Sequence, residues 1–230
     1  MSNLSYMQKA TDRGQLQIHV TTERGFFPIK DASIRLSYTG NPTEIIEELS
    51  TDISGQTAAV ELPAPPLEYS MEPSEFQPYS EYTIQVNASG YRPINISGIS
   101  VLPDKTSIQN VRMETATVEN PLERNIVITA NTLYGNFPPK IPEDEIKPMT
   151  ESGEIVLSRV VIPEYVIVHD GPPSDSSAND YYVRYRDYIK NVASSEIYAT
   201  WPDAALRANI LAIMSFTLNR VYTEWYRNQG

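Results

Sequence analysis

The sequence predicts an α+β protein with two domains, an all-β sandwich followed by a mainly helical domain. Two patterns carry this prediction. Between residues 16 and 113, apolar and polar residues alternate in several short runs, which is typical of strands that bury one face. After residue 181, apolar residues recur at helical spacing as far as residue 227, which indicates two helices.

The alternating runs are separated by residues that favour turns. Apolar or aromatic side chains occupy every second position in three runs: Leu16, Ile18 and Val20; Ile34, Leu36 and Tyr38; and Tyr82, Ile84, Val86 and Ala88. Turn residues occur at 40–42, 54–55, 89–90 and 103–104. This spacing predicts an antiparallel sandwich of about seven strands over residues 14–114.

Residues 115–130 contain Pro121 and few regularly spaced apolar residues, so we interpret them as a linker. Arg124 lies in this stretch, and exposed segments are preferred sites of proteolysis. We therefore expect a processing site here. Residues 131–180 are rich in proline and contain two apolar runs, Glu154–Leu157 and Tyr165–Val168, each expected to be a short strand or extended segment.

The first predicted helix begins near Tyr181 and ends near Glu196. Its apolar positions recur every three or four residues, at Tyr185, Tyr188, Ile189, Val192, Ala193 and Ile197. Glu196 therefore lies at the end of this helix, on its apolar face or at the edge of that face. A carboxylic acid among apolar neighbours is a candidate proton donor.

A break at Trp201–Pro202 precedes the second predicted helix. We expect Thr200 to be its N-cap and Asp203 to complete an approximate capping box. The helix is apolar on most sides, which predicts burial in a domain larger than residues 131–230 provide. We therefore interpret residues 131–230 as the N-terminal part of a truncated domain.

Composition narrows the function classes. The formal charge of −11 disfavours nucleic acid as a partner, because an acidic chain repels phosphate. The chain has no cysteine, which excludes disulfides, thiolate catalysis and cysteine-ligated zinc. Residues 1–14 lack the apolar core of a secretory signal, and no apolar run has the length of a membrane span.

The predicted sandwich resembles a known domain family. Asp52–Gly55 lies in a turn between strands, and the run Tyr82–Ala88 leads into Gly90 and Tyr91. In these features residues 14–114 resemble the carboxypeptidase-regulatory-like, transthyretin-like domain. The resemblance implies a sandwich fold and says little about activity.

The helical region resembles the SpoIID/LytB family. The matching residues are Tyr188, Ile189, Val192, Ser194, Ser195, Glu196, Ile197, Pro202, Ala205, Leu206, Arg207, Ala208 and Asn209. Met214 and Phe216 depart from the family, which often has Arg and Tyr there. The resemblance implies that Glu196 is the catalytic residue.

A closer resemblance is to the SleC-like spore cortex-lytic enzymes of clostridia. Residues 132–142, 168–172, 188–201 and 211–227 match that family, and 62–65 and 78–80 resemble its pro-region. The resemblance implies a zymogen in the bacterial spore, in the cortex and coat region. It also implies a Csp subtilisin-like protease as activator and cortex peptidoglycan as substrate. We expect no cofactor and no metal.

The chemistry expected of Glu196 is proton donation to a glycosidic oxygen. The C6 hydroxyl of muramic acid then attacks and closes an anhydro ring. We expect burial near Val192, Ile197 and Trp201 to keep the acid protonated. Trp201 is the candidate platform for a sugar ring.

Other readings remain open at this point. His169–Asp170 invites a metal or amidase interpretation, but a zinc site needs three ligands and the only other histidine is His19. Ser194 and Ser195 lack a nearby base, residues 143–145 lack the spacing of a calcium loop, and Tyr222 and Trp225 read as core. A second hypothesis is a non-catalytic binding or structural spore protein with a vestigial, truncated helical domain.

Overall fold

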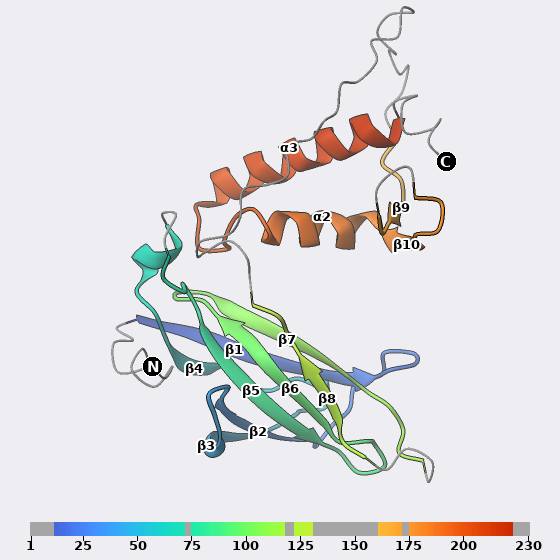
Figure 1. Ribbon diagram of the computed structural model, residues 1–230. Helices are drawn as coiled ribbons and strands as arrows, with labels where there is room; N and C mark the ends of the chain where they lie inside the picture. Colours follow the sequence, from blue (N-terminus) through green and yellow to red (C-terminus); the bar gives the residue numbers. More distant parts are fainter. Residues whose placement is uncertain (1–11, 72–74, 118–121, 131–160, 172–174, 223–230) are drawn as a thin grey trace, which may run out of the picture. The chain divides into compact units, whose positions relative to one another are not determined.

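The computed structural model describes residues 12–71, 75–117, 122–130, 161–171 and 175–222 (Figure 1). The chain divides into two compact units, residues 1–136 and residues 137–230. The described part of the first unit is built of strands with one short 3-10 turn, η1 (Leu67–Ser70). The described part of the second contains a two-stranded sheet and two helices. The expected order, a β-sandwich followed by helices, is therefore observed.

The strands of the first unit form two sheets. They are β1 (Asp12–Thr22), β2 (Ser33–Tyr38), β3 (Asn41–Ser50), β4 (Val60–Ala64), β5 (Ser80–Asn87), β6 (Ile94–Val101), β7 (Thr106–Met113) and β8 (Arg124–Val127). One sheet has the order β4-β1-β7 and the other the order β3-β2-β5-β6-β8. Two neighbouring pairs, β1–β7 and β6–β8, are parallel, so the sandwich is not purely antiparallel as expected.

The predicted alternating runs fill the core of this unit. Leu16, Ile18 and Val20 on β1 are fully buried. The same holds for five side chains on β2 and β5, namely Ile34, Leu36, Tyr82, Ile84 and Val86. Tyr38 and Ala88 pack at the edge of the same cluster. The period-two pattern thus correctly identified the strand faces that meet between the sheets.

Part of the predicted linker is a strand. Residues 124–127 form β8, which pairs in parallel with Ile94–Ser97 of β6. The next residue, Ile128, donates its backbone N–H to Ser97 O across 2.9 Å. Gly98 (φ +83°) makes this approach possible, because a Cβ there would lie 2.4 Å from Ile128 O. The short edge strand left only a weak alternating signal in the sequence.

The first strands in the described part of the second unit form an antiparallel hairpin, β9 (Tyr165–His169) and β10 (Asp180–Arg184). β9 confirms the strand expected at Tyr165–Val168, whereas Glu154–Leu157 lies outside the described residues. Helix α2 (Tyr185–Ser194) starts four residues later than expected. The reason is that Tyr181–Arg184 pair with β9 and cannot be helical at the same time.

Helices α2 and α3 (Asp203–Tyr222) form an antiparallel helical hairpin (Figure 1). Their shared core consists of Val166, Tyr185, Ile189 and Ile213, with other apolar side chains at its margin. On α3, Leu211 and Phe216 are 63% and 56% exposed. The two helices and the hairpin therefore bury only part of the apolar surface of α3. Neither helix, within the described ranges, is long and apolar enough to cross a membrane.

The expected N-cap of α3 is wrong. The Thr200 hydroxyl is buried without a hydrogen-bond partner in the described part of the chain. The carbonyl of Pro202 instead accepts hydrogen bonds from the N–H groups of Ala205 and Leu206, at 2.9 and 3.1 Å. Pro202 thus occupies the cap position, immediately before the first helical residue, Asp203.

Candidate functional site

The connection between α2 and α3 contains both residues that the sequence predicts as functional. Helix α2 ends at Ser194, and the backbone N–H groups of Ser195 and Glu196 bond back to Val192 O and Ala193 O. Glu196 therefore follows the last turn of the helix. Trp201, partly buried, lies in the next turn, where its N–H donates to Tyr198 O across 3.1 Å.

Asn209 of α3 contacts the predicted catalytic acid. Its Nδ2 donates a hydrogen bond to Oε2 of Glu196 across 3.3 Å. The two residues are thirteen positions apart in sequence. They meet because α3 runs antiparallel to α2. The sequence resemblance includes Asn209, but residue spacing alone did not indicate that it would reach Glu196.

The expected burial of Glu196 is not observed. Its side chain is exposed, while the next residue, Ile197, is only 8% exposed and packs inward. Helical spacing was extended too far, because α2 ends at Ser194 and the chain changes direction there. In this chain the carboxyl group therefore faces solvent next to an amide donor.

Ser194 and Ser195 have a local structural role. Both hydroxyls donate to the carbonyl of Asn191, at 2.9 and 3.0 Å. Such bonds satisfy carbonyl groups that the end of a helix leaves without partners. The two serine hydroxyls therefore help to close α2.

His169 pairs with Asp180 on the neighbouring strand. Its Nδ1 lies 2.9 Å from Oδ1 of Asp180, directly across the β9–β10 pair. In the described ranges, no group of three or more His, Asp or Glu side chains gathers in a way that could hold a metal ion. The geometry around His169 therefore gives no support to a zinc site. Residues 143–145, the side chain of Tyr222 and Trp225 lie outside the described residues.

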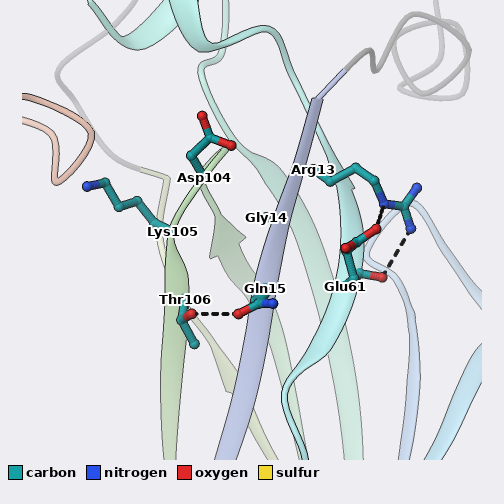
Figure 2. A pocket seen from close by; sticks show the side chains of 7 residues that line it. All are labelled: Arg13, Gly14, Gln15, Glu61, Asp104, Lys105 and Thr106. Atoms are coloured by element: carbon teal, nitrogen blue, oxygen red, sulfur yellow. Dashed lines mark hydrogen bonds and ion pairs between the residues drawn. The ribbon is translucent and has the colours of Figure 1, made fainter.

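The first unit carries an open polar hollow at one end of β1 (Figure 2). It has a volume of about 340 Å³, and its lining comprises Arg13, Gly14, Gln15, Glu61, Asp104, Lys105 and Thr106. Arg13 forms an ion pair with Glu61, and Thr106 donates to Gln15 across 2.9 Å (Figure 2). Ligand sites are usually apolar clefts with a few polar groups, so this hollow is a weaker candidate than the α2–α3 connection.

Comparisons with known proteins show no family for this chain. No protein-family model matches the sequence, and no curated protein matches it at a significant level. Similar solved structures include the Bacillus anthracis TIE protein, with 17% identity over 46% of this chain and a TM-score of 0.32. The minor pilin GBS52 of Streptococcus agalactiae has 13% identity over 46% of this chain and a TM-score of 0.32.

A third similar structure is Klebsiella pneumoniae 5-hydroxyisourate hydrolase, with 16% identity over 45% of this chain and a TM-score of 0.30. The matched region spans 17% of the first structure, 46% of the second and 92% of the third. Scores and identities this low give no grounds for assigning a function.

Proposed function

We propose that this protein is a spore cortex peptidoglycan-cleaving enzyme of the lytic transglycosylase type, with Glu196 as its proton donor. In this proposal the chain is made as a zymogen and acts in spore germination. Residues 131–230 belong to a SpoIID/LytB-like catalytic domain. The observation that carries the proposal is the Asn209–Glu196 hydrogen bond, because it joins two residues of the motif that resembles this family.

The proposed reaction needs one acid. Glu196 gives its proton to the oxygen that leaves C1 of muramic acid as the C1–O bond breaks. The C6 oxygen of the same sugar forms the new bond to C1. Its hydroxyl proton returns to the Glu196 carboxylate, so that the acid is restored. Asn209 holds the carboxylate in one orientation throughout, and the bound glycan supplies the cover that the exposed side chain lacks.

The zymogen part of the proposal concerns residues 115–130. A Csp subtilisin-like protease would cut there and release the first unit. Leu122 O accepts a hydrogen bond from Arg92 Nε at 2.6 Å, and Arg124 N donates to Pro93 O at 2.9 Å. A protease that reaches residues 122–127 must therefore detach β8 from β6.

The test compares wild type with Glu196→Gln, both processed in the linker, on purified spore cortex fragments. We expect anhydro-muramic ends to form with the wild type and to fall at least 100-fold with the variant, since general acid catalysis contributes about 10²–10⁴-fold. Asp187→Asn, which neutralises an exposed acid on α2, is the matched control and should retain activity. Equal release by wild type and Glu196→Gln would refute the role of Glu196.

The exposure of Glu196 favours a second candidate, a non-catalytic binding or structural spore protein with a vestigial helical domain. This candidate predicts that the wild type binds cortex fragments but releases no anhydro-muramic ends. The same assay therefore separates the two functions.

A further inference from the structure

The β9–β10 hairpin presents three pairs of side chains on one face. Residues opposite each other in the register are Tyr165 with Arg184, Ile167 with Tyr182, and His169 with Asp180. Side chains directly opposite in an antiparallel pair share one face of the sheet, and those along a strand alternate between faces. These six residues therefore form a single surface, which we call the hairpin face.

Three valines on the opposite face of the hairpin belong to the core of the second unit or pack against it. Val166, Val168 and Val183 alternate with the residues of the hairpin face and pack against side chains of α2 and α3. The hairpin face is instead open: Tyr182 is 77% exposed, Ile167 59% and Tyr165 44%. Contiguous exposed apolar side chains with a polar rim mark binding surfaces.

Polar groups lie at both ends of the hairpin face. At one end, the ring of His169 contacts the Asp180 carboxylate at 2.9 Å. At the other end, the nearby Tyr165 side chain is the main factor that raises the pKa of Arg184. The face thus has an apolar centre, an acidic group at one end and a cationic group at the other.

We propose that the hairpin face binds the sugar rings of a glycan strand, as a substrate subsite separate from Glu196. This inference rests on the proposed function and names a second contact for the same polymer. Tyr165 and Tyr182 are diagonal neighbours about 7–8 Å apart at Cα, so both rings lie within reach of one ligand. Tyrosine combines an apolar ring with a polar tip and suits a ligand that remains partly hydrated.

The charge pattern favours a sugar over other occupants. Asp180 and Arg184 carry opposite charges at the two ends of the face, and Ile167 and Tyr182 at its centre are uncharged. Sugar rings likewise have apolar faces with hydroxyl groups around their edges. Carboxylate, imidazole and guanidinium groups bind such hydroxyls, because together they supply both acceptors and donors. A polymer with a strong charge of one sign would be repelled by the group of like charge at one end of the hairpin face.

The experiment measures binding of the full chain to purified peptidoglycan and to a soluble oligomer of N-acetylglucosamine. We expect Tyr182→Ala to weaken binding about fivefold to tenfold, the range of one aromatic contact, and Tyr165→Ala to act in the same direction. Tyr182→Phe should bind nearly as wild type. Tyr181→Ala is the matched control, since Tyr181 pairs with Val168 on the opposite face and is 50% exposed.

Three results would overturn the inference. They are unchanged binding by Tyr182→Ala, an equal loss with Tyr181→Ala, and a finding by sedimentation that the hairpin face mediates self-association instead. Glu196→Gln keeps this test separate from the proposed function. If it binds as wild type but cleaves nothing, failure of Tyr182→Ala to weaken binding rejects only the hairpin face. If it cleaves normally, weaker binding by Tyr182→Ala still supports the hairpin face.

Discussion

Asn209 donates a side-chain hydrogen bond to the carboxylate of Glu196, with 3.3 Å between Nδ2 and Oε2. Glu196 follows the last turn of α2, whereas Asn209 belongs to α3. The bond therefore ties the predicted acid to a helix rather than to the connection that carries it. The Glu196 side chain is otherwise exposed to solvent.

Replacing Asn209 by Ala should lower the rate of glycan cleavage about tenfold to 100-fold. Glu196 becomes charged as it gives up its proton, and a hydrogen bond to a charged group is worth about 1.5–3 kcal/mol. Each 1.4 kcal/mol corresponds to a tenfold change in rate. As a positioning residue, Asn209 should affect kcat more than KM. Asn219→Ala, at an exposed position of the same helix, is the control. A uniform rise in KM with unchanged kcat would contradict a positioning role.

Tyr82→Phe should destabilise the sandwich by about 1–3 kcal/mol. Tyr82 on β5 is fully buried, and its hydroxyl donates to Pro63 O on β4 across 2.7 Å. This bond joins the two sheets, and its loss leaves a carbonyl group without that donor. Urea unfolding monitored by circular dichroism measures the change. Tyr91→Phe, a partly buried tyrosine of the same core, should cost less.

Glu81→Gln should raise the thermal stability of the sandwich at pH 7. Burial raises the pKa of Glu81 above its ordinary value of 4.5, so the folded protein binds this proton more tightly than the unfolded chain. The corresponding stability is present below pH 4.5 and is lost as the pH rises through the raised pKa. Glutamine does not ionise, so the variant does not lose this stability at neutral pH.

The pH dependence of melting temperature checks this prediction. The advantage of Glu81→Gln over wild type should shrink as the pH falls below 4.5. Glu47→Gln, at an exposed position on β3, should show no comparable gain at pH 7. A lower melting temperature for Glu81→Gln at pH 7 would contradict the expected sign.

The buried strand faces could be predicted because one physical rule determines them. A strand with one buried face must alternate, and Leu16, Ile34 and Ile84 lie in runs long enough to show it. The parallel pairing of β1 with β7 could not be read in the same way. Alternation identifies which face is buried but not which strand lies alongside.

The candidate site shows where local patterns stop being informative. Helical spacing placed Glu196 near the apolar face, but α2 ends two residues earlier and Ile197 takes the inward position. Thr200 had the right residue type for an N-cap, yet Pro202 provides the first carbonyl of α3. The Asn209 contact depends on how two helices pack, which no local rule contains.

The contacts that hold β8 in place provide a test of the processing site expected within residues 115–130. Glu114 forms ion pairs with Arg92 and Arg124, each at 3.1 Å, and Arg92 also bonds to Leu122 O. Arg92→Ala removes two of these contacts and should speed cleavage within residues 115–130 about tenfold, because proteolysis follows the population of the locally opened state. Subtilisin digestion followed by mass spectrometry measures the rate at each site.

Arg112→Ala, a change at an exposed position on β7, is the control and should leave the cleavage rate unchanged. If both variants are cut in this segment at the wild-type rate, the ion pairs around Glu114 do not control access to it, and the segment must open by another route.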